Sequence, residues 1–319
     1  QLGESSGDAL GVADLAAVGA GEAAWVDLVD DAGPPPWRQI GDIGLIGAGD
    51  EKFRQSVLAG VELAVAALSV DGGDDASLAI MTTDSRPKRA VVTRDGWTIG
   101  GMAKGAGMLA PGLATMLVVI TTDAVASSAE LDTALRGTTR VTFDRLDSDG
   151  CMSTNDQVTL MASGASGITP DPAAFAEALA EVCRTLTTQL QGDAEGATHD
   201  ITIEVIGAAS EFDAVTVGRS VARNNLFKAA IFGNDPNWGR VLAAIGTTDA
   251  EFDPYDVDVT MNGVRVCTQG GPDRPREEVD LTPRATHLQI DLRSGTTSAT
   301  IWTNDLTHDY VHENSAYAS

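Results

Sequence analysis

Thr115 lies where a loop of small residues meets a buried apolar run. The loop, residues 100–114, is rich in glycine and alanine, and the run MLVVI at 116–120 follows Thr115. If the bond before Thr115 breaks, this residue carries both a hydroxyl and a free α-amine. Such an amine has an unperturbed pKa of about 7.7–8.0, so it can serve as the base that a hydroxyl nucleophile needs. An ordinary loop-to-strand turn accounts for the same spacing, and by spacing alone that is the stronger interpretation.

Residues that commonly bind metals or activate a serine stand in no functional pattern. The sequence has no HExxH, HxE, GxSxG or GxxxxGK[ST] arrangement, which disfavours zinc enzymes, serine hydrolases and P-loop proteins. Residues 104–107 (KGAG) precede no predicted helix and are a weak candidate for a phosphate loop. We therefore expect no metal and no cofactor. The histidines are His199, His287, His308 and His312, of which the last two lie in a segment that looks extended and are expected at the surface.

Charge and composition limit the partners. The 319 residues carry a formal net charge of -25, which argues against nucleic acid, because its binding proteins present a basic surface. No run approaches the roughly 20 apolar residues of a membrane span, and the start shows no signal peptide. We therefore expect a cytoplasmic protein with no membrane partner. Cys151, Cys183 and Cys267 are far apart, which favours buried free thiols over a disulfide framework.

Strands interleaved with helices predict an α/β or α+β fold of layered sheets with flanking helices. Periodicity predicts a strand at 116–120 that is buried on both faces and a hairpin that turns at Asp95-Gly96. Ser127 and Glu130 form a capping box before a helix. Before residue 40 only short helical pieces are expected, and an Asp/Gly-rich turn is expected at 71–75. The other predicted helices are 53–68, 127–135, 172–191, 214–223 and 240–245, and the other predicted strands are 90–93, 97–101, 201–205, 257–261, 288–292 and 299–302.

The segment from Lys104 to Asp123, KGAGMLAPGLATMLVVITTD, closely resembles the self-processing site of the ornithine acetyltransferase family. These are the glutamate N-acetyltransferases of arginine biosynthesis, which are N-terminal-nucleophile enzymes. The resemblance covers about residues 40–319 and is strongest to actinobacterial members. Further blocks match in the same order at 80–84 with 87–88, 149–156, 193–198, 231–240, and 305–307 with 314–319.

The resemblance implies a self-cleaving acyltransferase. Cleavage between Ala114 and Thr115 would give an α chain, 1–114, and a β chain, 115–319, that assemble as an α2β2 heterotetramer. Thr115 would take the acetyl group from N-acetylornithine and pass it to glutamate in a ping-pong reaction. Many relatives also accept acetyl-CoA, so the resemblance leaves that donor open. Ser319 matches the family's last residue, so a complete C-terminus is expected.

Six positions match the family's substrate-binding residues. Lys104 would pair with a carboxylate, and Glu195 with an ammonium group of the acceptor or donor. The remaining side chains would supply neutral hydrogen bonds. The six positions are Thr82, Lys104, Thr115, Glu195, Asn314 and Ser319.

Two departures from the family pattern stand near the N-terminus. The family builds its oxyanion hole from a Thr-Gly pair, where this chain has Ile43 and Gly44. Gly44 keeps its backbone N–H, but Ile43 offers no side-chain donor, although one donor is worth about 3–4 kcal/mol. The family's Asn/Ser/Gly-rich block is missing before residue 40, so that region is truncated or diverged. Two alternatives therefore remain, an amidase or aminopeptidase that uses water as the acceptor, and an impaired or non-catalytic homologue.

Overall fold

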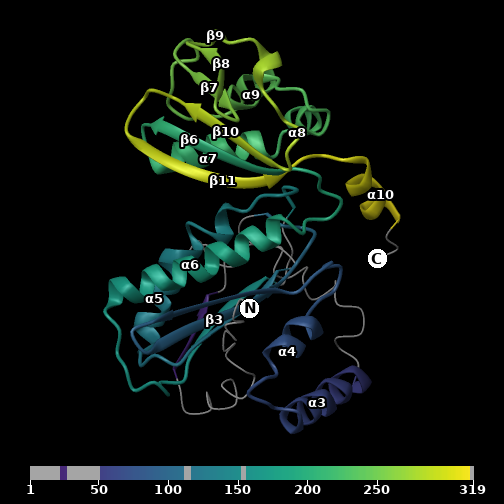
Figure 1. Cartoon of the computed structure of the whole chain (residues 1–319), viewed down its shortest axis with the longest axis vertical. Coiled ribbons are helices and arrows are strands. Elements are labelled where there is room, and N and C mark those ends of the chain that lie inside the picture. Colours follow the sequence, from purple (N-terminus) through teal and green to yellow (C-terminus); the bar gives the residue numbers. More distant parts are fainter. Residues whose placement is uncertain (1–21, 27–50, 111–115, 152–155, 317–319) are drawn as a thin grey trace, which may run out of the picture. The chain divides into compact units, whose positions relative to one another are not determined.

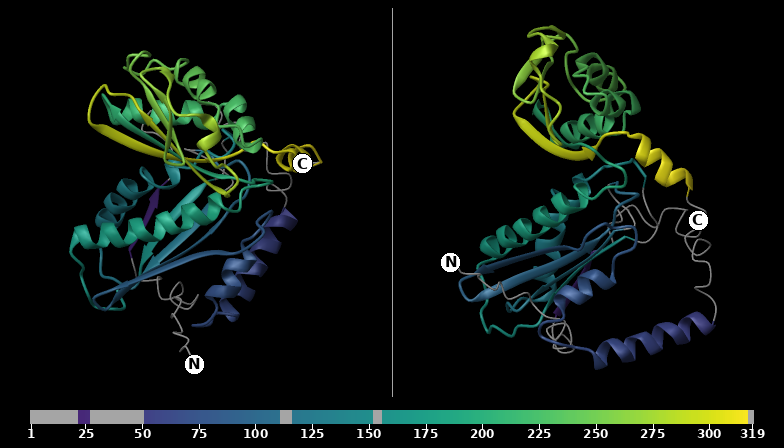
Figure 2. Two further views of the ribbon diagram at one scale, coloured as in Figure 1. Left: turned by 45° about the horizontal axis from the view of Figure 1, so that its top comes forward. Right: turned by 45° about the vertical axis from the view of Figure 1, so that its right-hand side comes forward.

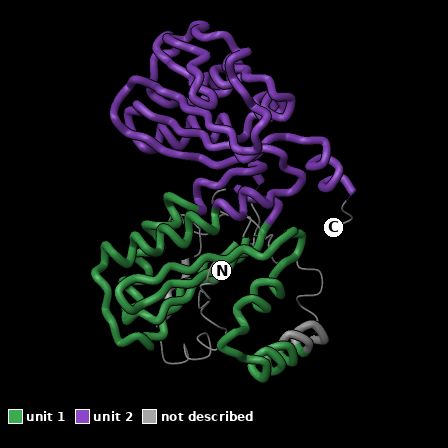
Figure 3. Tube along the Cα trace, in the orientation of Figure 1, with its two compact units in different colours: residues 1–105, 112–142, 153–187 green, residues 106–111, 143–152, 188–319 purple. Residues whose placement is uncertain are grey.

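The computed structural model describes residues 22–26, 51–110, 116–151 and 156–316. The chain forms two compact units (Figure 3). Unit 1 is made of residues 1–105, 112–142 and 153–187, and unit 2 of residues 106–111, 143–152 and 188–319. Each unit therefore contains residues from both sides of the Ala114–Thr115 bond.

Unit 1 is built on a five-stranded mixed sheet (Figure 1). The order is β1 (Glu22–Val26), β5 (Gln157–Ala162), β4 (Leu117–Thr122), β3 (Trp97–Lys104) and β2 (Lys88–Arg94), with β4 and β5 parallel. The predicted hairpin is confirmed as β2–β3. Its turn at Asp95-Gly96 has φ of 36° and 85°, the two positive values that a tight hairpin turn requires. β1 is a strand in the region where only short helical pieces were expected.

The prediction that the strand at 116–120 is buried on both faces is wrong. Along β4, Val118, Ile120 and Thr122 are buried, whereas Leu117 is 37% exposed. The buried face meets α6 (Pro172–Gln191), which lies along the sheet in Figures 1 and 2. Gly101 of β3 provides room for this contact, since a Cβ there would be 3.1 Å from Leu186 of α6. The apolar run suggested burial on both faces because valine and isoleucine favour strands whether one face or both faces are covered.

Three helices of unit 1 were predicted, and a fourth stands where a turn was predicted. The helix expected at 53–68 is α3 (Glu51–Ala66), and the helix at 172–191 is α6. α5 (Ser128–Thr139) begins at Ser127 with the predicted capping box, in which Ser127 and Glu130 satisfy each other's backbone N–H. The turn predicted at 71–75 is only partly present, because α4 (Gly73–Ala79) begins within it. Asp74 and Asp75 lie in the first turn of α4, where acidic side chains stabilise a helix.

Unit 2 has a six-stranded mixed sheet with helices on one face. The order is β11 (Thr297–Asn304), β6 (Asp200–Ala208), β10 (Ala285–Asp291), β7 (Asp258–Met261), β8 (Val264–Thr268) and β9 (Gly271–Pro272), with β6 and β10 parallel. β6 alternates buried and half-buried residues as predicted. The covering helices are α7 (Glu211–Ala222), α8 (Asn225–Phe232) and α9 (Trp238–Ile245). A Cβ on Gly218 of α7 would lie 2.6 Å from Ile301, so glycine sets this close approach.

Two sequence expectations about single residues need correction. The segment around His308 and His312 is not extended but forms α10 (His308–Ala316), although both histidines are exposed as expected. Thr307 starts this helix, because its hydroxyl accepts the backbone N–H of Tyr310 at 2.9 Å. Cys183 and Cys267 are buried, whereas Cys151 is exposed.

The described part of the chain has no helix that is both long enough and apolar enough to cross a membrane. Among the same residues, no group of three or more histidine, cysteine, aspartate or glutamate side chains is placed to hold a metal ion.

Candidate active site

The structure describes four of the predicted site residues. Thr82 and Lys104 lie in unit 1, and Glu195 and Asn314 lie in unit 2. The predicted residues outside the described ranges are Ile43, Gly44, Ala114, Thr115 and Ser319.

In unit 1, the structure brings Lys104 and Thr82 together. Lys104 ends β3 and is buried, with 6% of its surface exposed, and its Nζ donates to the Thr82 hydroxyl at 3.5 Å. Thr82 is exposed in the loop after α4. A cation on a rigid strand beside an exposed hydroxyl can bind a carboxylate.

The buried side chain of Asp84 holds Thr82 and the end of β3 at Lys104 in place. Its carboxylate accepts hydrogen bonds from the Thr82 N–H at 3.1 Å, from the Gly105 N–H at 2.6 Å and from Lys88 Nζ at 2.5 Å. Burial raises the pKa of Asp84, but the bonds from Lys88, Gly105 and Thr82 outweigh burial and lower it below its usual value. The buried ion pair thus connects the loop that carries Thr82 to the residue after Lys104.

Asp156 is a second buried carboxyl group in unit 1, to which the sequence analysis gave no role. It directly precedes β5, and its Oδ1 accepts the Met116 N–H at 2.8 Å. Burial raises the pKa of Asp156 to about 7, and the Met116 N–H and the charge of Lys104 counter this only in part. The sequence signal was its place in the matching block 149–156, which names the residue type but not its surroundings.

In unit 2, Glu195 and Asn314 are in contact. Asn314 on α10 donates through Nδ2 to Glu195 Oε2 at 3.2 Å. The Glu195 N–H donates to the Ala106 carbonyl oxygen at 2.9 Å. The Glu195 carboxylate lies directly on Gly107, where an added Cβ would be 2.6 Å from Oε2. Gly107 therefore gives the carboxylate its position, a role that the sequence analysis did not assign.

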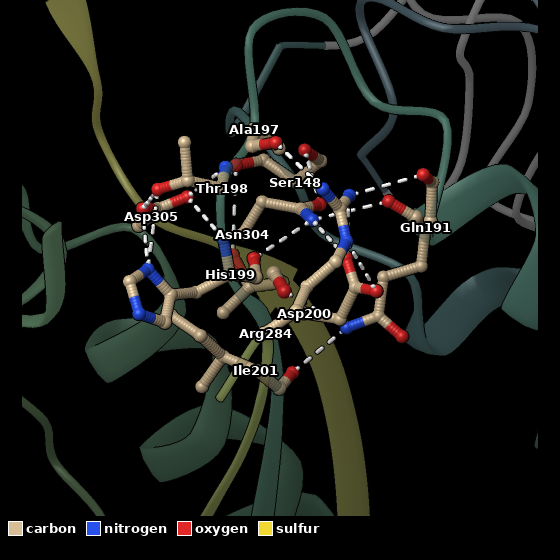
Figure 4. Close-up of polar contacts among 12 residues, drawn as sticks. Ser148, Gln191, Ala197, Thr198, His199, Asp200, Ile201, Arg284, Asn304 and Asp305 are labelled. Atoms are coloured by element: carbon tan, nitrogen blue, oxygen red, sulfur yellow. Dashed lines mark hydrogen bonds and ion pairs between the residues drawn. The ribbon is translucent and has the colours of Figure 1, made fainter. Parts of the chain in front are cut away.

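A polar network holds the loop that carries Glu195 (Figure 4). Asp305 accepts the backbone N–H groups of Thr198 and His199, both at 2.9 Å, as well as the His199 ring at 2.8 Å and the Thr198 hydroxyl. Arg284 pairs with Asp200 and donates to the carbonyl oxygens of Ala197 and Gly192. Asp305 and His199 are buried and Asp200 is half-buried, whereas Thr198 and Arg284 are exposed, so the network ties the loop to the fold both in the interior and at the surface.

The same network anchors the loop to α10. Thr307 donates its hydroxyl to the Gly196 carbonyl oxygen at 2.7 Å and caps the helix that carries Asn314. Gly196 has φ of +63°, and an added Cβ would be 2.2 Å from the Tyr310 nitrogen. Glycine is therefore required here both for the backbone conformation and for the close packing.

The fold is mixed α/β, and each unit holds a charged group that can bind a charged small molecule. Residues 42–319 match the family model described as the ArgJ family. The chain is 64% identical over 263 residues to an arginine biosynthesis bifunctional protein ArgJ of Streptomyces coelicolor, covering 82% of this chain and 69% of the relative. The protein of the same name from Thermobifida fusca is 60% identical over 276 residues, which cover 86% and 72%.

A solved structure supports the same assignment. The crystal structure of the arginine biosynthesis bifunctional protein argJ from Bacillus halodurans matches with a TM-score of 0.59 and 35% identity. The match covers 63% of this chain and 98% of the solved one. The chain belongs to the ArgJ family.

Proposed function

We propose that this chain is a glutamate N-acetyltransferase of arginine biosynthesis that transfers an acetyl group from N-acetylornithine to glutamate. Membership of the ArgJ family supports this, because the relatives are named arginine biosynthesis bifunctional proteins. The single observation that carries the choice of acceptor is the Glu195 carboxylate, which Asn314 and Gly107 hold in place. A fixed anion can bind the ammonium group of an amino-acid acceptor before that group loses a proton and attacks, whereas water as the acceptor needs no such anion.

We infer that Thr115 is the nucleophile and that the chain cleaves itself between Ala114 and Thr115. The products are an α chain, 1–114, and a β chain, 115–319, which assemble as α2β2 in the cytoplasm.

The reaction then runs in two halves. The Thr115 oxygen bonds to the acetyl carbonyl carbon while its proton passes to the α-amine of the same residue. Ornithine leaves with that proton on its nitrogen, and acetyl-Thr115 remains. The glutamate amine attacks this ester, the Thr115 oxygen is reprotonated, and N-acetylglutamate departs. Lys104 with Thr82 binds a substrate carboxylate, and Glu195 with Asn314 binds an ammonium group, while Ser319 completes the set of substrate contacts.

Gly44 supplies one oxyanion donor, and the Ile43 side chain supplies none. This motivates the second candidate, an impaired homologue. The resemblance to the family adds acetyl-CoA as a further candidate donor, and the relatives are named bifunctional.

The proposal is tested by incubating the purified chain with N-acetylornithine, with and without glutamate. We expect N-acetylglutamate and ornithine in equal amounts only when glutamate is present, and peptide mass spectrometry should find acetyl on an N-terminal Thr115. Acetate release without glutamate would identify an amidase instead. A cleaved chain that transfers nothing would support the impaired homologue.

Gly107→Ala is expected to raise KM for glutamate and to lower kcat/KM by about 10- to 100-fold. The added methyl group displaces the Glu195 carboxylate, and losing one charge-assisted hydrogen bond costs about 1.5–3 kcal/mol. Gly137→Ala is the matched control, because a Cβ there meets nothing within 4 Å. Steady-state kinetics of the two variants test this prediction. Equal effects of the two substitutions would contradict a positioning role for Gly107.

A further inference from the structure

The backbone at 106–109 supports the Glu195 carboxylate in unit 2. The Ala106 carbonyl oxygen accepts the Glu195 N–H at 2.9 Å, and an added Cβ on Gly107 would lie 2.6 Å from Glu195 Oε2. The carboxylate therefore rests against the bare Cα of Gly107, and the position of Gly107 sets the position of this anion.

Asp149 holds the residue that follows Gly107. Its Oδ2 accepts the Met108 N–H at 2.7 Å, a bond between residues that are 41 positions apart in the sequence. Its Oδ1 accepts the Cys151 N–H at 3.1 Å, so both carboxylate oxygens of Asp149 bind backbone groups. The Asp149 side chain thus connects its own turn to the segment that supports Glu195.

The turn that carries Asp149 is anchored in the interior of unit 2. The Ser148 N–H donates to the Leu109 carbonyl oxygen at 2.5 Å, and the Ser148 hydroxyl donates to Asn304 Oδ1 at 2.8 Å. Lys228, of which only 5% is exposed, donates through Nζ to the Ser148 carbonyl oxygen. Asp149 is therefore presented to the segment 106–109 by a fixed part of the fold.

Met108 needs this support because of its backbone conformation. Its φ is 53°, in the left-handed region that residues other than glycine, asparagine and aspartate seldom adopt. In the described part of the chain, Gln269 and Arg293 are the other such residues, with φ of 49° each. All three donate their backbone N–H to an aspartate carboxylate. The Met108 side chain is 46% exposed, so its own packing contributes little, and the bond to Asp149 stabilises the conformation.

Asp149 and Glu195 also act on the same side chain of α10. Burial raises the pKa of Tyr310 to about 12, and the charges of Asp149, Cys151 and Glu195 add to this rise. Tyr310 lies one helical turn before Asn314, which donates to its carbonyl oxygen and to Glu195 Oε2. Asp149 therefore lies close enough to the Glu195 site to influence it.

We propose that Asp149 is a positioning residue of the Glu195 site. It holds Met108 in the left-handed conformation, and this keeps Gly107 against the carboxylate that binds the ammonium group of the amino-acid acceptor. The inference rests on the proposed function of Glu195. Because Asp149 acts through the backbone, its loss should weaken binding of the acceptor and leave acetyl transfer at saturating glutamate nearly unchanged.

Asp149→Ala is expected to raise KM for glutamate about tenfold and to change kcat by less than about twofold. Glycine adopts positive φ without strain. The same substitution in a Met108→Gly background should therefore raise KM by less than about threefold. Asp149→Asn retains one carbonyl oxygen as an acceptor and should fall between wild type and Asp149→Ala. Steady-state kinetics of the purified protein measure all of these effects.

Hydrogen-exchange mass spectrometry tests the same inference without using activity. The Glu195 N–H donates to the Ala106 carbonyl oxygen, so its exchange depends on the segment 106–109. The peptide that contains Glu195 is expected to exchange at least about tenfold faster in Asp149→Ala than in wild type. Unchanged exchange would overturn the inference whether or not the protein transfers acetyl groups.

Asp291→Ala is the matched control. Asp291 accepts the N–H of Arg293 at 3.0 Å and lies at the opposite end of β6 from the loop that carries Glu195. This substitution removes the same kind of bond and should leave KM for glutamate unchanged. An equal rise in KM in this control would overturn the inference and leave the proposed function intact, as would a rise in Asp149→Ala that Met108→Gly does not reduce. A wild-type protein that transfers no acetyl group, with faster exchange in Asp149→Ala, would overturn the proposed function and support the positioning role.

Discussion

Thr115→Ala is expected to leave a single intact chain of 33.0 kDa and to abolish acetyl transfer. Alanine has no hydroxyl to attack the Ala114 carbonyl carbon, and no α-amine is released to act as the base of the transfer reaction. Removing a nucleophile that works together with its base lowers kcat by at least about 10⁴-fold. Intact-mass spectrometry checks the first effect, and the assay with N-acetylornithine and glutamate checks the second.

Thr115→Ser is the matched control for this prediction. It keeps a hydroxyl at the same position, so it should still cleave and transfer, although at a lower rate. N-terminal sequencing of the wild-type β chain should begin at Thr115. Appearance of two chains from Thr115→Ala would place the cleavage elsewhere and would remove Thr115 from the mechanism.

Lys88→Met is expected to destabilise unit 1 by about 3–5 kcal/mol, the typical effect of removing one partner of a buried ion pair. Lys88 is completely buried and pairs with Asp84 at 2.5 Å, and the side chain of Asp84 is only 1% exposed. Without the lysine, the carboxylate remains in the interior with only its backbone donors. The loop that carries Thr82 should therefore loosen together with the strand end at Lys104.

Hydrogen-exchange mass spectrometry on β2 and β3 peptides under mild denaturant measures this loss of stability. The lowered pKa of Asp84 gives the sign of the pH dependence. The pair contributes its stability above the unfolded pKa, about 3.9, and this stability is lost as pH falls through the lower folded pKa. In the variant, the carboxyl group without its lysine takes up a proton more readily, so the difference from wild type should shrink on acidification.

Arg94→Met provides the comparison. Arg94 and Glu181 form an ion pair in the same unit, but both side chains are about half exposed, at 45% and 49%. Solvent screening limits such a pair to about 0–1 kcal/mol. Equal losses of stability in the two variants would contradict the importance of burial at Lys88.

Local sequence signals predicted the elements that depend on nearby residues. The β2–β3 hairpin follows from Asp95-Gly96, whose backbone must turn with positive φ, and α5 follows from the capping box at Ser127. The bounds of α6 agree with the prediction because its apolar positions recur regularly over 20 residues. α10 was missed because its start depends on Thr307, which also bonds to the distant Gly196.

The site residues likewise divide into those that the sequence predicted and those that only the tertiary structure revealed. The family motifs pointed to Lys104, Glu195 and Asn314, and the structure pairs each of them with a polar neighbour. Asp156 and Gly107 lay inside matched segments but received no role. The structure adds that Oδ2 of Asp156 is buried with no hydrogen-bond partner among the described residues, and that the Glu195 carboxylate lies against the Cα of Gly107. Neither feature can be read from residue type.

The sequence alone thus determined the fold class, the family resemblance and the chemical types at the site, with Thr115 at a loop-to-strand junction. These depend on periodicity, turn chemistry and motif order, all of which are properties of neighbouring residues. Only the tertiary structure decided that one face of β4 is covered, that Asp84 pairs with Lys88, and that Oδ2 of the buried Asp156 has no hydrogen-bond partner among the described residues. Burial and hydrogen bonding between distant segments set these properties, and they separate two carboxylates that look alike in the sequence.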